Sequence, residues 1–209
     1  MTASAAPVAT RRYRGSSAPE RRAQRREQLI RAAIDVYGER GYRNATVKAV
    51  CEAAGLTERY FYESFANSEA LLVASYRAVT GILLKTLQEA GDAAGGDAVE
   101  RAQAILARYF EALRNDPPSA RLFLVEIAGV SAELDRVFAA SLEAFGVLLA
   151  RTLGTASGGG QERLLRTAAV GGIIHLAFDW VARGYVETHG EVVAAALRLA
   201  LLLRPGTAP

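Results

Sequence analysis

The sequence contains few of the residues that most catalytic and metal sites need. It has one cysteine, Cys51, and two histidines, His175 and His189, among 209 residues. A single cysteine excludes an intramolecular disulfide framework and fits a reducing compartment. The sequence also lacks the Cys-x-x-Cys and His-Glu-x-x-His motifs, a phosphate-binding loop and a Gly-x-Ser-x-Gly motif. We therefore expect no metal, no cofactor and no catalytic residue.

Long apolar runs are missing as well. The longest candidate, VVAAALRLALLL at residues 192–203, contains Arg198 and is shorter than the roughly 18 residues that indicate a membrane-spanning helix. The first residues lack the apolar middle of a secretory signal. Hydrophobic residues make up 51% and charged residues 22% of the chain, which permits a real core. We expect a cytoplasmic protein with no membrane partner.

The alternating pattern of half-buried strands is absent too, and the apolar spacing instead predicts an all-α protein of about nine helices. We divide the chain into a disordered basic tail (1–18), a three-helix domain (19–66) and a larger helical domain (67–209). The expected helices cover residues 19–40, 47–54, 58–64, 68–90, 98–115, 119–129, 132–153, 161–184 and 190–203.

Glycine, proline and threonine mark the expected helix ends. Gly41 and Gly55 stand where a helix would stop, and Thr46 and Thr57 stand where side chains cap the next helix by accepting a bond from a backbone N–H. Glycine-rich breaks are expected at 91–97 and 155–160, and Pro117 with Pro118 forbids continuation of the preceding helix.

Positive charge is concentrated in the first third of the chain. Residues 1–66 hold 12 Lys/Arg and 7 Asp/Glu, whereas residues 67–209 hold 13 and 15. A basic end on a slightly acidic remainder favours contact with a polyanion such as DNA through that end. A basic tail without a specific role is the alternative.

Two short helices joined by a glycine turn predict a helix-turn-helix, whose second helix enters the major groove. Buried positions would be Val50, Cys51, Ala54, Leu56, Phe61 and Phe65. Thr57, Glu58, Arg59, Tyr60, Tyr62 and Glu63 then remain on the outer surface. Threonine, tyrosine and arginine bond phosphates and base edges well. The alternative is an ordinary amphipathic helix with solvated aromatics.

The segment GYRNATVKAVCEAAGLTERYFYESFANSEALL, residues 41–72, resembles the DNA-binding region of the TetR family of bacterial regulators. The resemblance implies phosphate contacts at Thr46 and Lys48 and a groove-facing set of Thr57, Arg59, Tyr60 and Tyr62. Where the family usually has lysine, this chain has Ser68. The contact there would fall to helix N–H groups aided by Asn67 and Ser68, with Arg43 as a substitute and Arg11, Arg12 and Arg14 as an N-terminal arm.

In a protein resembling this family, the later helices would form the ligand-binding and dimerisation body. A mostly apolar cavity is expected from Tyr109, Phe110, Phe123, Glu126 and Phe145, although core packing explains the aromatics equally well. His175 and Asp179 share a helix face and would serve the ligand, the dimer interface or each other. The last two helices would pair with a second copy of the chain as a four-helix bundle, through Gly171, Gly172, Val193, Leu197 and Leu201.

The expected function is therefore a homodimeric repressor of a palindromic double-stranded operator, released by a small molecule. Three alternatives stay open: an activator of the same fold, an all-α enzyme using His175 with Asp179 or Glu126, and an interaction protein whose helix-turn-helix serves only for packing.

Overall fold

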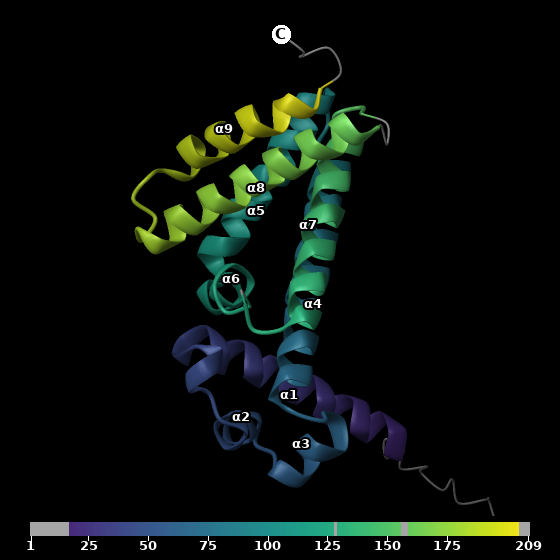
Figure 1. Cartoon of the computed structure of the whole chain (residues 1–209), viewed down its shortest axis with the longest axis vertical. Helices are drawn as coiled ribbons and strands as arrows, with labels where there is room; N and C mark the ends of the chain where they lie inside the picture. Colours follow the sequence, from purple (N-terminus) through teal and green to yellow (C-terminus); the bar gives the residue numbers. More distant parts are fainter. Residues whose placement is uncertain (1–16, 128, 156–158, 205–209) are drawn as a thin grey trace, which may run out of the picture.

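The structure is a computed structural model that describes residues 17–127, 129–155 and 159–204, and these residues form helices without any strand. Three helices make its lower end: α1 (Ala18–Arg40), α2 (Val47–Ala54) and α3 (Glu58–Ser64). The long α4 (Ser68–Ala93) rises from this end into the upper bundle (Figure 1). The bundle continues with α5 (Ala98–Asn115), α6 (Pro117–Leu124), α7 (Ala132–Thr152), α8 (Gly160–Ala182) and α9 (His189–Ala200). Short 3-10 helices cover Tyr42–Asn44 and Leu201–Leu203.

The first helix begins one residue earlier than predicted, at Ala18. Ser17 caps it in a capping box: the backbone N–H of Glu20 donates to the Ser17 hydroxyl, and the Ser17 N–H donates to the Glu20 carboxylate at 2.6 Å. Pro19 stands in the first turn, where its missing N–H costs nothing. The rest of the predicted tail, including Arg11, Arg12 and Arg14, lies outside the described residues.

Capping explains the two short helices, with one correction. The Thr46 hydroxyl accepts a bond from the Ala49 N–H at 3.1 Å, and Gly55 ends α2 in the left-handed conformation, at φ 66°. Thr57 occupies the position before α3, but its side chain makes no capping bond. The predicted capping role of Thr57 is therefore wrong, and the hydroxyl is available to another acceptor or donor.

Several other predicted boundaries were wrong: α6 ends at Leu124 and not at residue 129, α8 at Ala182 and not at 184, and α9 at Ala200 and not at 203. The end of α4 and the start of α6 also differ, for reasons that the contacts show. α4 continues through Gly91 to Ala93. Gly91 lies at a close contact between α4 and α5, since an added Cβ there would lie 2.9 Å from Ile105. Glycine therefore serves the packing of the two helices and does not end α4. α6 starts at Pro117, not at residue 119. Asp116 caps it by accepting from the Ser119 N–H at 3.2 Å, and prolines suit a first helical turn.

Helix α1 links the two ends of the molecule. It packs against α2 and α3 below and against α4 and α6 above. The contact with α6 is very close, because an added Cβ at Gly38 would lie 2.4 Å from the Pro118 Cα. The position of α1 is therefore set jointly by α2 and α3 and by the bundle.

Helices α4 and α8 are long and apolar enough to cross a membrane by length and composition alone. In the described structure α4 packs against α1, α5, α6 and α7, and α8 packs against α7 and α9. Contacts within the chain therefore use a large part of the apolar surface of α4.

The Gly38–Pro118 contact generates a stability prediction. Gly38→Ala places a methyl group against backbone, which a close-packed interior does not absorb, so we expect a loss of about 1–3 kcal/mol of unfolding free energy. Gly81→Ala is the matched control: its Cβ would meet nothing within 4 Å, so it should stabilise the unliganded chain by up to about 1 kcal/mol through helix propensity. Thermal denaturation compares the two variants. If Gly38→Ala and Gly81→Ala melt at the same temperature, the close contact between Gly38 and Pro118 is contradicted.

Candidate nucleic-acid interface and effector cavity

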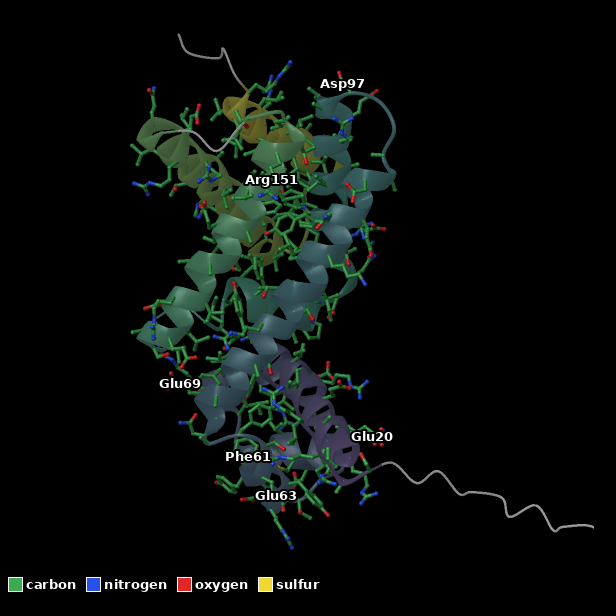
Figure 2. All side chains as sticks on the ribbon, turned by 90° about the vertical axis from the view of Figure 1, so that its right-hand side faces the viewer. Glu20, Phe61, Glu63, Glu69, Asp97 and Arg151 are labelled. Carbon is green, nitrogen blue, oxygen red and sulfur yellow. The ribbon has the colours of Figure 1, made fainter. Side chains whose placement is uncertain are left out.

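A buried seam holds α3 in place. Four of its six predicted members are buried, whereas Ala54 and Leu56 are half-buried and pack against it. Val50 and Cys51 of α2 and Phe61 of α3 are buried, as is Phe65 at the end of α3. Phe61 and Phe65 lie 5.9 Å apart between ring centroids. In Figure 2, Phe61 and Glu63 lie close together at the lower end of the molecule. Because the seam takes the apolar side of α3, its other side faces outward.

The outward side of α3 carries a long cation and an aromatic hydroxyl in solvent. The Arg59 side chain is 84% exposed and Tyr62 is 61% exposed. Tyr60 is half-buried, because the guanidinium of Arg25 covers its ring at 4.4 Å from the centroid. Of the four residues predicted to face the groove, Thr57, Arg59 and Tyr62 are therefore exposed and Tyr60 is half-buried.

Glu63 ties α3 to α1. Its carboxylate accepts a bond from Arg59 Nε at 3.0 Å and forms an ion pair with Arg25 at 3.8 Å. Its backbone carbonyl accepts from Arg22 at 2.5 Å. Glu63 therefore pairs with Arg25 on α1 and with Arg59 on its own helix. The arrangement pre-orients the arginine along the outer face of α3.

The remaining predicted DNA contacts surround this face. Lys48 on α2 is exposed and lies 3.9 Å from Glu52, and Arg43 is exposed on the 3-10 turn. Asn67 caps α4 by accepting from the Ala70 N–H at 2.8 Å, and Ser68 is the first residue of that helix. The N-terminus of α4 therefore offers backbone N–H groups, as expected where the family usually has a lysine.

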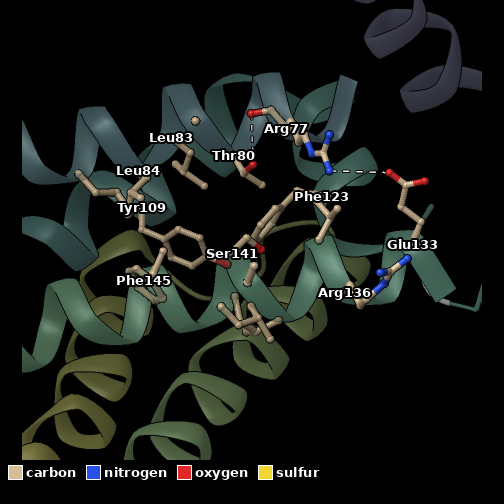
Figure 3. Close-up of a pocket in the computed structure, with 17 residues that line it drawn as sticks. Arg77, Thr80, Leu83, Leu84, Tyr109, Phe123, Glu133, Arg136, Ser141 and Phe145 are labelled. Atoms are coloured by element: carbon tan, nitrogen blue, oxygen red, sulfur yellow. Dashed lines mark hydrogen bonds and ion pairs between the residues drawn. The ribbon is translucent and has the colours of Figure 1, made fainter. Parts of the chain in front are cut away.

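The bundle contains a cavity of about 550 Å³ between α4 and α7. Its lining is mainly apolar, with arginines at one end: Figure 3 shows Arg77, Glu133 and Arg136 together there, and Leu84, Tyr109 and Phe145 toward the other. The Arg77 guanidinium and the Glu133 carboxylate lie 3.7 Å apart. The cavity therefore suits a ligand with an apolar body and an anionic group.

Three of the aromatic residues predicted for the cavity line it: Tyr109, Phe123 and Phe145. Burial raises the pKa of the Tyr109 hydroxyl, and this hydroxyl has no hydrogen-bond partner among the described residues. Phe110 does not line the cavity. It is fully buried and packs edge-on against Trp180, with centroids 5.5 Å apart.

The position of Glu126 does not support the prediction that it lines the ligand cavity, nor that it is solvated. Its side chain is 10% exposed; one carboxylate oxygen accepts from the Tyr42 N–H at 2.7 Å and the other from Arg121 Nε at 3.0 Å. Gly41 permits this approach, since a Cβ there would lie 3.2 Å from the carboxylate. Glu126 therefore joins the end of α6 to the turn after α1.

His175 and Asp179 lie on the outside of α8, and both are exposed. Asp179 pairs with Arg183 at 3.6 Å, whereas the His175 ring faces Phe178 at 6.5 Å. Neither residue lines the first cavity, so the expectation that they contact its ligand is unsupported, and His175 is not placed to act with Glu126. Among the described residues no group of three or more metal-ligating side chains occurs.

The predicted dimer residues divide into two groups. Gly171 is exposed and a Cβ there would meet nothing within 4 Å, so its surface is open to a second chain. A Cβ added at Gly172 would instead lie 3.1 Å from Leu199 of α9, and Val193 is buried within the chain. These two positions serve the contact between α8 and α9. Leu197 and Leu201 are half-buried.

Sequence reasoning missed most of the cavity because its lining comes from several helices, mainly α4 and α7, that are distant in sequence. The missed residues on α4 and α7 include Arg77, Thr80, Leu84, Arg136, Val137 and Ser141. Gly81, in the middle of α4, was the available signal: a helix-interior glycine without a close neighbour leaves open space.

Comparison with known proteins gives the same fold. Residues 29–74 match the family model described as bacterial regulatory proteins, tetR family. The fatty acid metabolism regulator protein of Bacillus subtilis (strain 168) is 26% identical over 163 residues, which are 74% of this chain and 82% of that protein.

Solved structures extend the likeness to the bundle. The fatty acid degradation regulator FadR from Bacillus halodurans matches with a TM-score of 0.71 and 22% identity, over 93% of this chain and all of that chain. FadR from Bacillus subtilis in complex with stearoyl-CoA matches with a TM-score of 0.69 and 23% identity, over 87% and 99%. A tetR-family regulator from Streptomyces coelicolor matches with a TM-score of 0.73 and 18% identity, over 87% and 80%.

The matched segment 29–74 contains the buried seam, the outward face of α3 and the start of α4. Residues 29–74 therefore match the DNA-binding region of the tetR family of bacterial regulatory proteins, and the chain as a whole shares the fold of these regulators.

Proposed function

We propose that the protein is a homodimeric repressor that reads a palindromic operator with α3. The observation that carries this proposal is the outward face of α3, where Arg59 and Tyr62 stand in solvent while Phe61 is buried beneath them. Arg59 is assigned to base edges and Tyr62 to the backbone, with Thr57 and Tyr60 beside them. Further phosphate contacts are assigned to Arg43, Thr46, Lys48, Asn67 and Ser68.

An apolar stripe on α8 supports the dimer. Leu164, Gly171, His175 and Phe178 are exposed at helical spacing, and Leu164 is 61% exposed. In a two-fold dimer this stripe meets its own copy, and Gly171 allows close approach. Two α3 helices about 34–36 Å apart would then occupy successive major grooves.

We propose a long-chain acyl thioester as the effector. The structural neighbour from Bacillus subtilis is in complex with stearoyl-CoA, and the cavity between α4 and α7 combines an apolar interior with Arg77 and Arg136 at one end. The arginines would hold anionic groups of the ligand, and the apolar interior would hold the chain.

The effector would act through two links between the cavity and the DNA end. α4 lines the cavity and begins directly after α3. Phe123 of α6 also lines it, and Glu126 shortly beyond α6 bonds the Tyr42 N–H. A ligand that favours a different placement of α4 and α6 changes the spacing of the two α3 helices. A coupling of about 1–3 kcal/mol changes operator affinity about 5–150-fold.

The operator proposal is tested with the palindromes that flank the gene encoding this chain. Arg59→Ala should weaken specific binding about 5- to 150-fold, since a bidentate base contact contributes about 1–3 kcal/mol. Lys85→Ala, at an exposed pair with Glu89 on α4, is the control and should change affinity less than about twofold. Fluorescence anisotropy at several salt concentrations measures both. If Arg59→Ala binds the operator as tightly as the unaltered protein, Arg59 does not read bases. If the unaltered protein binds all DNA sequences equally at every salt concentration, the proposed operator-binding function is wrong.

The dimer proposal is tested by Gly171→Arg. A long cation on the α8 stripe should convert the dimer to a folded monomer that loses high-affinity operator binding, because a buried unpaired charge is strongly unfavourable at an interface. Light scattering after size-exclusion chromatography measures the mass. Ala139→Arg, at an exposed position of α7, is the control and should stay dimeric. A wild-type chain that is monomeric at the concentrations that bind operator would contradict the proposal.

The effector proposal is tested by titrating the protein–operator complex with stearoyl-CoA. We expect release of the operator, and Arg136→Ala should weaken stearoyl-CoA binding about tenfold through loss of a charge-assisted contact. Arg198→Ala, exposed on α9, serves as the charge-matched control. Calorimetry measures the affinity of each variant. If stearoyl-CoA does not release the operator, the assigned effector is wrong. If Arg136→Ala and Arg198→Ala bind stearoyl-CoA equally well, the assignment of Arg136 to the anionic groups of the ligand is wrong.

A further inference from the structure

A second cavity, of about 470 Å³, lies between α1, α4, α5 and α6. All four helices contribute apolar side chains to it: Ile34; Val79, Ile82 and Leu83; Ala112 and Leu113; Ala120 and Phe123. Arg31, Asp35, Thr86, Arg108, Asn115, Asp116 and Ser119 add polar groups. Two residues, Leu83 and Phe123, line both this cavity and the first one. They form the wall between the two spaces, which we call the septum.

Leu83 and Phe123 have empty space on both sides, and Phe123 is itself 5% exposed. Leu84 and Ala144 also separate the first cavity from a further pocket. Leu87 and Tyr109, which line the first cavity elsewhere, are 1% exposed and belong to the close-packed core. A close-packed side chain cannot shift without displacing its neighbours, whereas a side chain that borders a cavity can. Leu83 is also only half-buried. An apolar chain that outgrows the first cavity therefore finds an apolar space beyond Leu83 and Phe123. The pocket beyond Leu84 and Ala144 suits it less, because Gln88, Asp92, Arg101 and Arg151 line it.

Length makes this outcome relevant to a long acyl chain. The wall that α4 provides to the first cavity runs from Arg77 to Leu87, which is about 15 Å at 1.5 Å per residue. An extended stearoyl chain exceeds that length. The anionic groups of this ligand are the phosphates of its CoA part. With these phosphates at the arginines, the acyl chain that points into the first cavity must fold back or leave it.

We propose that the second cavity is the binding site for the distal end of a long acyl chain, which passes between Leu83 and Phe123. This inference rests on the proposed acyl effector. The occupant is the apolar terminal segment of the ligand, held by the side chains of Ile34, Val79 and Leu113. A short acyl chain stays in the first cavity and does not reach the second.

The second cavity brings the ligand to the DNA end of the molecule. Ile34 belongs to α1, and α1 holds α3 through the Arg22 and Arg25 contacts with Glu63. A chain that enters this cavity touches α1 directly, whereas a chain confined to the first cavity acts only through α4 and α6. Long chains therefore release the operator more effectively than short chains at equal occupancy.

The test uses two matched substitutions and a series of saturated acyl-CoA ligands from octanoyl to stearoyl. Ala112 lines the second cavity only, and Ala144 lines the first cavity but not the second; both are half-buried. Ala112→Phe should weaken stearoyl-CoA binding about tenfold or more, the cost of returning two or more methylenes to water, and leave octanoyl-CoA binding within about twofold. Ala144→Phe should weaken binding across the whole series.

A third variant changes the septum in the opposite direction. Leu83→Ala joins the two cavities, so it should raise the affinity for stearoyl-CoA relative to octanoyl-CoA. Leu87→Ala, one helical turn further along α4, enlarges only the first cavity and should not change this ratio. Far-ultraviolet circular dichroism confirms that each variant is folded before titration.

The outcomes separate this inference from the proposed function. If Ala112→Phe weakens every ligand equally or none, or if Leu87→Ala and not Leu83→Ala extends the accepted length, the second cavity does not hold the chain end, although the effector assignment stands. If the unaltered protein binds no acyl-CoA, the effector assignment fails and this inference fails with it.

Discussion

The burial of Phe61 and Phe65 against the short helices and α1 is the contact on which the DNA-binding end depends. These rings are fixed in the seam, and the helical repeat then turns Arg59 and Tyr62 to the opposite side. Seven residues do not make a stable helix by themselves, so α3 keeps its shape through this seam and through the Glu63 contacts with α1. A polar helix face is useful for recognition only when its support is rigid.

α1 and α4 connect that end to the bundle in different ways. α4 is continuous between the DNA end and the first cavity, so a change in its tilt moves both. α1 lies across the base and meets α6 at Gly38 and Pro118 without spare volume. Glu126 adds a hydrogen bond to the turn after α1. Elements packed this closely move between distinct arrangements and do not deform gradually. A two-state switch requires such distinct arrangements.

Local signals in the sequence were enough for the helices and for the outer face of α3, because caps, glycines and apolar spacing act within a few residues. The boundaries of α2, α3 and α5 were predicted to the residue. The failures involve contacts between distant segments. Gly91 lies within α4, where it permits close packing against Ile105 of α5. Glu126 accepts a hydrogen bond from the Tyr42 N–H, and Gly172 packs against Leu199 of the same chain. The lining of both cavities depends on how α4 packs on α5, α6 and α7, which no single helix encodes.

The central claim is that the outward face of α3 enters the major groove, twice per operator. Methylation interference at guanine N7 reports this most directly, because N7 lies in the major groove. The account predicts that methylation blocks binding at two clusters of guanines, centred about 10 base pairs apart and related by two-fold symmetry. Binding that is insensitive to N7 methylation, together with sensitivity to modification of the minor groove, would contradict it.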